Sequence, residues 1–370
     1  MARLYTPETR PDDGADKGAG TGKSEGAEGA GGAGGTPPEA EPRAEAEARA
    51  EPTTKAKPRW RDRVGRWRRG WVVAGLALAL ALVMTLHARV PNTIGNLGSL
   101  LQTFMPWLGL TIPVLALCAV LRRSVTAVAA LLVPALVWLN LFGGLLLDKS
   151  GDGGALMVVS HNVDAGNADP AGTARRLAES GADLLALQEL PQDELATYEE
   201  ALAAAYPHHA VQGTVGLWSR YPLGDTEPVD IGMGWTRAMR TTVDSALGDL
   251  AVYVAHLPSV RVQFRAGFTA GQRDDAADLL GRAIAAEPLD RAVLLGDLNG
   301  TMNDGALAPL TSQLRSTQGA AGAGFGFSWP VGFPMARIDQ ILVRDLEPVS
   351  SWTLPTTGSD HLPVAARLDP

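Results

Sequence analysis

AVLLGDLNG, residues 292–300, is an apolar run that ends abruptly in polar side chains. Residues 291–295 have the length and aliphatic content of a short, buried strand. Gly296 then leads to Asp297 and Asn299, a carboxylate and a carboxamide. In α/β folds, ligands bind where strands end and loops begin. The stretch therefore predicts an α/β domain with functional side chains at one edge of a sheet.

Polar residues also stand at the ends of other apolar segments in the second half of the chain. Three apolar segments end in such a residue: VVSHN in Asn162, LLALQE in Glu189 and AVYVAH in His256. In ARID, Asp339 stands instead at the start of a strand. Near the C-terminus, GSDHLPV (358–364) places Asp360 beside His361. One such residue alone is usually an ordinary loop residue. The whole set predicts a shared site at the ends of neighbouring strands.

Residues 151–370 alternate between strand and helix patterns. We expect strands over 155–163, 183–188, 209–212, 215–219, 239–243, 250–255, 291–295, 338–343 and 363–367, and helices over 171–180, 192–205 and 268–286. An α/β domain of this length is large enough to bury a proper core.

The first part of the chain differs in composition. Residues 1–58 are rich in Gly, Ala, Glu and Pro and are expected to be disordered. Residues 59–70 are a basic juxtamembrane segment, since they continue a run of eight Lys or Arg that adjoins apolar sequence. Residues 71–147 contain three apolar stretches, near 71–86, 104–121 and 125–147, which predict three transmembrane helices.

Charges flanking these stretches predict an orientation. The basic run precedes the first stretch, and Arg122 and Arg123 separate the second from the third. The positive-inside rule then places the N-terminus in the cytoplasm and everything after Asp148 outside the cell membrane. The only cysteine, Cys118, lies in the second stretch, so no disulfide framework is expected.

The charge of the outer domain bears on its partners. Residues 151–370 contain 14 Arg, no Lys and 27 Asp or Glu, which gives 14 − 27 = −13. Such a domain repels polyanions on average, whereas grip on duplex DNA comes mainly from Lys and Arg that neutralise phosphates. Nucleic acid is therefore a disfavoured partner, and no obligate protein partner is evident from the sequence.

The polar set is chemically coherent. Carboxylate and carboxamide oxygens suit a hard cation such as Mg²⁺, with Mn²⁺ as the alternative. The domain has no cysteine and no HExxH pair for zinc, no GxxxxGK[ST] loop and no GxSxG elbow. These observations favour metal-assisted hydrolysis of a phosphate ester by water.

The ordered motifs SHNV, LLALQEL, GLWSRYPL, VAHL, LLGDLNG, RIDQILV and SDHLPV cover residues 156–368. This set resembles the endonuclease/exonuclease/phosphatase family, which includes sphingomyelinases and inositol-polyphosphate phosphatases. The resemblance implies a four-layer α/β sandwich, in which two packed mixed β-sheets are flanked by helices. Here the sandwich would follow the N-terminal membrane anchor.

The resemblance also implies roles for the metal ligands. Glu189 matches the principal Mg²⁺ ligand of the family, and Asn162 lies beside the same metal. Asp360 would stand at the metal end of the site. His161 precedes Asn162 where many relatives have an aromatic residue, and packing is the expected role for it.

Further roles follow from the same motifs. Asp297 and Asn299 match the pair that orients the attacking water and stabilises the developing charge. His256 would contact the scissile phosphate. His361 would bind the phosphate or assist proton transfer, with Asp339 fixing its tautomer and raising its basicity. In the TRAMR segment, Arg240 is expected to contact the substrate, and the role of Arg237 is left open. Trp235 and residues 327–329 are candidates for the rim of the pocket. Residues 319–326 are expected to form a glycine-rich surface loop.

Architecture narrows the substrate. A basic tail, three spans and an outer catalytic domain look like the VanJ-type teicoplanin-resistance membrane phosphatases of actinobacteria, which implies a lipid-linked phosphate such as undecaprenyl pyrophosphate and the lipid bilayer as partner. The alternatives are an extracellular endonuclease or exonuclease, a phospholipase C-like phosphodiesterase of the sphingomyelinase type, and a domain that only binds.

Overall fold

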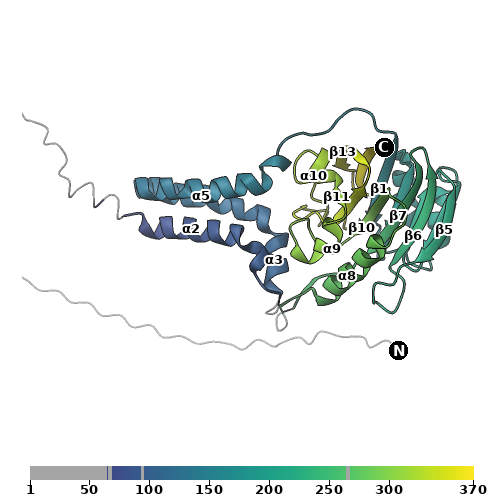
Figure 1. Cartoon of the computed structure of the whole chain (residues 1–370), viewed down its shortest axis with the longest axis horizontal. Helices are drawn as coiled ribbons and strands as arrows, with labels where there is room; N and C mark the ends of the chain where they lie inside the picture. The colour runs from purple at the N-terminus through teal and green to yellow at the C-terminus, as the bar shows by residue number, and fades with distance from the viewer. Residues whose placement is uncertain (1–64, 66–68, 93–95, 264–266) are drawn as a thin grey trace, which may run out of the picture. The chain divides into compact units, whose positions relative to one another are not determined.

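The structure is a computed structural model that describes residues 65, 69–92, 96–263 and 267–370. The expected disordered tail (1–58) and most of the basic segment (59–70) lie outside these residues. The described chain consists of a helical segment (71–145) and an α/β domain (156–369) (Figure 1).

Two six-stranded mixed sheets form the α/β domain. The first sheet has the order β13 (Glu347–Thr353), β14 (Val364–Asp369), β1 (Leu156–Asn162), β2 (Leu184–Gln188), β4 (Val215–Ser219), β3 (His208–Gln212). The second sheet has the order β11 (Arg315–Ser316), β12 (Asp339–Arg344), β10 (Ala292–Asp297), β7 (Gly248–His256), β6 (Ala238–Ser245), β5 (Leu223–Pro228). Two short strands, β8 (Arg261–Gln263) and β9 (Gly267–Thr269), pair with each other.

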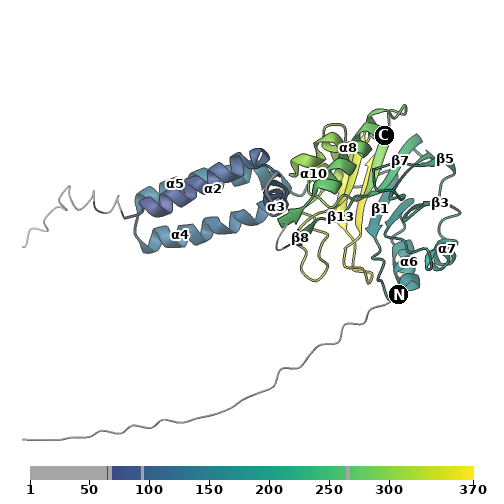
Figure 2. The same cartoon turned by 90° about the horizontal axis from the view of Figure 1, so that it is seen from below.

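Helices cover the outer face of each sheet. The first sheet packs on α6 (Pro170–Glu179) and α7 (Leu195–Leu202), and the second packs on α8 (Gly271–Ala285), η4 (Gly305–Leu307) and α9 (Ala308–Thr311). Figure 1 shows α8 running along the second sheet, and Figure 2 shows α6 and α7 beside the first. The helix α10 (Thr317–Ala321) follows β11.

Strand alternation explains the layers. Successive side chains of a strand point to opposite faces. In β10, Val293 and Leu295 enter the core between the sheets, whereas Ala292 and Leu294 face the helices. The same division holds in β1, where Leu156 and Val158 point inward. Two packed mixed sheets flanked by helices confirm the predicted α/β sandwich.

Some secondary structure departs from the predictions. No strand was predicted at β5, whose LGDTEP sequence is mostly exposed at a sheet edge, or at β13, which is also an edge strand. Such strands lack the apolar run that marks a central strand. The helix expected from residue 268 begins at Gly271, because Phe268 and Thr269 pair with β8.

The helical segment is less regular than three straight spans. It contains α2 (Trp71–Thr85), η1 (His87–Arg89), α3 (Leu97–Thr103), η2 (Met105–Leu110), α4 (Thr111–Leu121), α5 (Val125–Phe142) and η3 (Gly143–Leu145). Among the described residues, one helix, Val125–Leu145, is long and apolar enough to cross a membrane. With 15 residues, α2 reaches about 22 Å, short of a hydrocarbon core of about 30 Å. The second apolar stretch consists of two helical pieces, Leu97–Thr103 and Met105–Leu121, whose axes meet at a bend of 67°.

Small side chains bring these helices together. Ala77, Ala119 and Ala127 are fully buried against one another, with Val73 and Leu131 beside them. Large apolar side chains point outward instead: Leu132 and Leu136 of α5 are 62% and 66% exposed. In the most apolar 18-residue stretch of Val125–Leu145, only 22% of the residues are buried, whereas a core helix of a soluble domain would be mostly buried.

A polar network attaches α3 to the α/β domain. The buried Arg273 of α8 forms an ion pair with Asp304 (2.7 Å) and donates to the Ser99 hydroxyl of α3 (3.0 Å). It also donates to the carbonyl oxygen of Asn299 at 2.9 Å. On the next turn of α3, Gln102 accepts from the Gly305 N–H at 2.8 Å. The bent helix is therefore linked directly to the loop that follows β10.

Candidate active site

The inward-facing positions of the central strands are apolar in the core and polar at one edge of each sheet. Asp297 follows Val293 and Leu295 in the inward series of β10, and His256 and Asp339 occupy matching inward positions of β7 and β12. In the register, Asp297 lies opposite both of them. Asn162 ends the inward series of β1 in the other sheet. The four strands thus direct the polar side chains at one of their ends into one space, with Asp339 at the start of β12 and the others at strand ends.

A hydrogen-bonded bridge joins the two sheets at this edge. Asn162 Nδ2 donates to Asp297 Oδ2 and to Glu189 Oε1, both at 3.1 Å. Glu189 Oε2 accepts from the Ala165 N–H at 3.2 Å. Glu189 directly follows β2 and has φ +59°, in the left-handed region that non-glycine residues seldom occupy. Strain of this kind persists where the surrounding contacts enforce it, and it gathers at functional sites.

The turn after β10 is equally constrained. Asn299 has φ +47°, and its N–H donates to Asp297 Oδ1 at 2.9 Å. Its side-chain amide donates to the Leu257 carbonyl oxygen at 3.0 Å and to Asp297 Oδ2 at 3.2 Å. Both amide hydrogens have partners, so the orientation of the Asn299 carboxamide beside Asp297 is determined.

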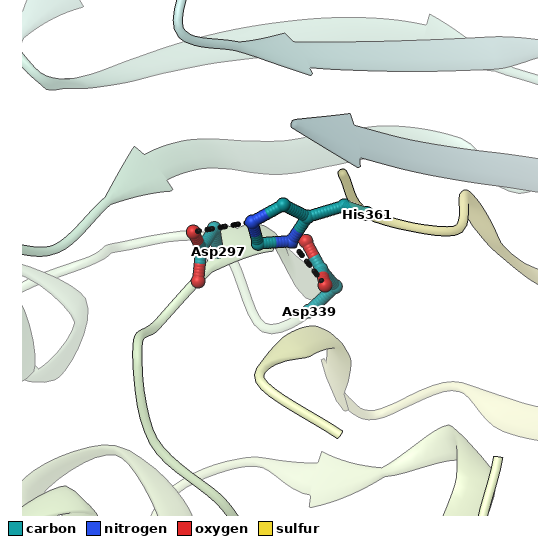
Figure 3. Close-up of side chains that lie close together, drawn as sticks. All are labelled: Asp297, Asp339 and His361. Atoms are coloured by element: carbon teal, nitrogen blue, oxygen red, sulfur yellow. Dashed lines mark hydrogen bonds and ion pairs between the residues drawn. The ribbon is translucent and has the colours of Figure 1, made fainter. Parts of the chain in front are cut away.

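The His361 ring lies between two carboxylates (Figure 3). Its Nδ1 is 2.9 Å from Asp339 Oδ2, and its Nε2 is 3.9 Å from Asp297 Oδ2. The Ser328 hydroxyl also donates to Asp339 Oδ2, at 2.6 Å. The backbone N–H of His361 donates to Ser359 Oγ, which in turn donates to the Asn162 carbonyl oxygen. The stretch from Gly358 to His361 is therefore attached to β1.

Burial and charge set the protonation of this group. Burial opposes a charge on His361, but Asp339 and neighbouring carboxylates outweigh it and raise the pKa of His361 to about 10. Burial also disfavours charge on Asp339, yet its contacts with His361 hold its pKa below the ordinary value. Burial, reinforced by the Asp339 charge, raises the pKa of Asp297 to about 7. At neutral pH, His361 is a cation paired with Asp339, while Asp297 can exchange a proton.

His256 and Arg237 complete the group around Asp297. His256 Nε2 lies 3.4 Å from Glu189 Oε1 and 3.7 Å from Asp297 Oδ2. Burial and the positive charge of Arg237 lower the pKa of His256 well below its usual value, so its ring is neutral. Arg237 Nη2 is 2.5 and 2.6 Å from the two ring nitrogens. A buried guanidinium therefore stands beside the carboxylates.

Part of this group borders a cavity of about 320 Å³, within the usual range for small-molecule sites, whereas His256 and Arg237 lie behind its lining. The polar residues of the α/β domain that line it are Asp164, Glu189, Ser259, Asp297, Asn299, Asp360 and His361. Trp329, predicted as a rim residue, also lines it, and its indole N–H donates to Asp360 Oδ2 at 3.3 Å. Two further lining residues, Thr103 and Phe104, come from the bend of the helical segment.

The donor set fits a hard divalent cation. The Glu189 side chain is 32% exposed and the Asp360 side chain 57% exposed, and both border the cavity. Mg²⁺ binds through one or two carboxylates and keeps several waters. Asp297, Asp339 and His361 also offer ligand atoms within 4.8 Å of one another, but Asp339 and His361 are hydrogen bonded to each other. The more accessible carboxylates suit the cation better.

One predicted site residue lies elsewhere. Arg240 of β6 is bonded to Glu287 at 2.9 and 3.0 Å, outside the group around Asp297. The nearby Arg237, which the sequence left undecided, is the arginine beside His256. Its position one residue before the start of β6, opposite the end of β7, was the available signal. Thr103 and Phe104 gave no signal, since both stand in apolar sequence.

The histidines outside the set lie in structural surroundings. His161 is buried and bonded to the Thr357 hydroxyl at 2.7 Å. His209 stacks on Trp218 with ring centroids 5.8 Å apart and lies 3.3 Å from Glu199. These contacts agree with the packing role expected for His161.

Comparison with known proteins agrees with this geometry. The family model described as endonuclease/exonuclease/phosphatase family matches residues 159–361, more than half of the chain. The chain belongs to the endonuclease/exonuclease/phosphatase family. Members of this family are hydrolases that act on phosphoester bonds, so the group around Asp297 is the candidate active site of such a hydrolase. No curated protein matches the chain.

Three solved structures are among those to which this chain is similar. A D. rerio TDP2 complexed with single-strand DNA product is 19% identical, with a TM-score of 0.50, and the match covers 58% of this chain and 99% of that one. An endonuclease/exonuclease/phosphatase from Beutenbergia cavernae is 20% identical (TM-score 0.45; 58% and 71% covered). A mutant beta toxin from Staphylococcus aureus with bound magnesium ions is 16% identical (TM-score 0.46; 58% and 99% covered).

Proposed function

We propose that this protein is a membrane-anchored, divalent-metal-dependent phosphohydrolase that acts on a lipid-linked phosphate such as undecaprenyl pyrophosphate. One observation carries the proposal: Phe104, in the apolar helical segment, lines the same cavity as Glu189 and His361. A phosphate bound there lies against the segment that contains the membrane-length helix. A substrate that combines phosphate with hydrocarbon suits both walls.

The family chemistry assigns the metal to Glu189, Asn162 and Asp360. When bound, Mg²⁺ supplies positive charge to the phosphate oxygens and favours ionisation of water. Glu189 and Asn162 are mutually hydrogen bonded, so the ligand nearest the sheets is already oriented. Asp360 also borders the cavity, and its carboxylate accepts a hydrogen bond from the Trp329 indole N–H. The same site would accept Mn²⁺, which also prefers oxygen ligands.

The remaining residues supply proton transfer and charge. Asp297, whose pKa is raised to about 7, accepts a proton from the attacking water, and Asn299 holds its orientation. His361, held as a cation by Asp339, stabilises negative charge on the phosphate and can donate a proton to the leaving oxygen. His256 is neutral and donates a hydrogen bond to a phosphate oxygen. Arg237 adds a second positive charge behind it.

Membrane attachment is part of the proposal. The outward-facing leucines and valines of α2, α4 and α5 form a surface that suits a bilayer better than water. The bent helix and the short α2 would complete a multi-pass anchor, with the tilt or bilayer thinning that short spans require. The positive flanks keep the N-terminus in the cytoplasm and the catalytic domain outside.

Phosphate release from undecaprenyl pyrophosphate by the purified full chain, with Mg²⁺ and then with EDTA, tests the function. Asp297→Asn should lower kcat by about 10²–10⁴-fold, because a positioned acid–base group contributes that much. Asp244→Asn, an exposed change at the other end of β6, should match wild type. Plasmid nicking with no lipid hydrolysis would instead show a nuclease, and release of phosphocholine from sphingomyelin would show a phosphodiesterase.

A further inference from the structure

A second cavity, of about 450 Å³, lies at the bend of the helical segment. Four aromatic residues form much of its wall: Trp107, Trp138, Phe325 and Phe327. The Trp107 and Phe327 rings stack with centroids 5.8 Å apart, and the Phe325 and Phe327 rings stack at 5.1 Å. Pro106 and Leu139 also line it. We call this space the aromatic cavity.

The wall of the aromatic cavity has little to offer water. Its lining within the described residues includes no charged side chain. The two polar groups of its tryptophans are already used, since Trp107 Nε1 donates to the Met335 carbonyl oxygen (2.8 Å) and Trp138 Nε1 to the Pro106 carbonyl oxygen (2.9 Å). A buried water needs two to four polar partners, and a space lined by carbon favours hydrocarbon.

The phenylalanines come from a segment that is held in place. The sequence predicted residues 319–326 as a surface loop, but Gln318 Nε2 donates to the Gly324 carbonyl oxygen and Arg337 Nη1 to that of Gly326. Gly326 has φ +58°, and a Cβ there would meet Arg337 at 2.6 Å. This fixed conformation holds Phe325 and Phe327 against the helices.

The two cavities are neighbours along the chain. Phe104 lines the cavity beside Asp297, which we call the phosphate cavity, and Pro106 and Trp107 line the aromatic cavity. Two residues span at most about 7 Å. On the domain side, Met335 accepts from Trp107, while the next residue, Ala336, lines the phosphate cavity. A molecule with a phosphate at one end and a chain at the other can occupy both.

From this continuity we propose that the aromatic cavity binds the hydrocarbon chain of the substrate, in the part closest to its phosphate. The inference rests on the proposed function, because it takes the occupant of the phosphate cavity to be a lipid-linked phosphate. The site recognises unbranched or branched hydrocarbon by contact area. The enzyme therefore selects lipid-linked phosphates over water-soluble phosphate esters at the helix bend, and not at Glu189 or His361.

A chain-length series tests the assignment. The full chain in one fixed detergent would be assayed with prenyl pyrophosphates of five, ten, fifteen and twenty carbons. Each buried methylene favours binding by about fourfold, so kcat/KM should rise at least tenfold from five to fifteen carbons and then level off as the cavity fills. A value that does not change with chain length would overturn the proposal.

Two phenylalanine substitutions on α5 provide a matched pair. Ala135 lines the aromatic cavity, whereas its neighbour Leu136 is 66% exposed. In Ala135→Phe the fifteen-to-five-carbon ratio of kcat/KM should fall towards one, and in Leu136→Phe it should equal that of wild type. Equal ratios in all three proteins would place chain selection elsewhere. If Ala135→Phe does not fold, the wild-type series still decides.

A binding measurement separates this proposal from the proposed function. A brominated C16 alcohol, which carries no phosphate, should quench the tryptophan fluorescence of wild type and of Asp297→Asn alike. Ala135→Phe should reduce that quenching, and Leu136→Phe should not. Cavity-dependent quenching without lipid hydrolysis would leave the chain site standing and reject the phosphatase. Equal quenching in all variants would show only general detergent-like uptake and reject the chain site.

Discussion

The phosphate cavity, which Phe104 lines, and the aromatic cavity, which Pro106 and Trp107 line, are built in opposite ways. The first collects charged groups from the ends of central strands, and hydrogen bonds join these groups to one another. The second is formed where a helix bends and a glycine-containing segment meets it, and aromatic carbon dominates its wall. Reactive groups need enforced geometry, whereas a hydrocarbon chain needs only surface and volume.

The comparison also separates catalysis from selectivity. Strand pairing holds Asp297 against His256 and Asp339, and a shift of one residue would turn these side chains to the other face. The aromatic cavity depends on packing between two parts of the chain and can change size without disturbing that register. Substrate range is therefore expected to vary more readily than the reaction.

The largest effect should come from Arg273, which links α3 to the loop that follows β10. Arg273→Met leaves Asp304 as a buried, unpaired carboxylate, which costs about 3–5 kcal/mol of the unfolding free energy. It also removes the bond to Ser99 of α3. Denaturant unfolding of the full chain measures the loss, and Arg282→Met, exposed on the same helix, is the control. Equal stability of both variants would show that the network does not hold α3.

A smaller effect, on kcat/KM, is expected when the ion pair between His361 and Asp339 is broken. Asp339 raises the pKa of His361 to about 10, so His361 keeps its proton until the pH exceeds that value. In Asp339→Asn, His361 should lose its proton nearer its ordinary value of 6.5, and the alkaline fall of kcat/KM should move to lower pH. At pH 8 the loss should be about 10–100-fold.

The pH profile of kcat/KM from 5 to 10.5 measures this shift. Asp345→Asn, an exposed change just beyond the other end of β12, should keep the wild-type profile. An alkaline limb at the same pH in wild type and Asp339→Asn would mean that His361 does not act as a cation.

The smallest effect is expected outside both cavities, at the Arg240–Glu287 pair. Burial opposes charge on Glu287, but hydrogen bonds from Arg240, Tyr253 and a backbone N–H outweigh it and lower its pKa to about 2. Glu287→Gln should cost about 1.5 kcal/mol at pH 7. A lowered pKa stabilises the fold above the unfolded value of about 4.3, so the difference should vanish as the pH falls from there towards 2.

Unfolding free energies at several pH values follow this effect, and kcat/KM should not change. The exposed pair Arg315–Glu347 offers the control, since Glu347→Gln should have an effect below about 0.5 kcal/mol. A difference that persisted at pH 2, or a loss of activity, would contradict the structural role of the pair.

Much of the phosphate cavity was predictable because strand alternation is local. The inward positions of β1, β7, β10 and β12 follow from counting by two from their apolar residues. Arg237 and Arg240 show the limit of that reasoning. They lie three residues apart in TRAMR, and only the contacts with His256 and Glu287 tell which one borders the site. The edge strand β5 was missed because its LGDTEP sequence is mostly exposed and carries no apolar signal.

The sequence by itself determined how polar and apolar residues alternate along the central strands. It also determined the family and therefore the class of reaction. Those properties depend on short-range alternation and on motifs that keep their order along the chain. The tertiary structure decided which arginine joins the site, that neighbouring carboxylates raise the pKa of His361 against the effect of burial, and that Phe104 lines one cavity while Pro106 and Trp107 line the other. Each of these depends on distances between residues far apart in the chain, which packing alone sets.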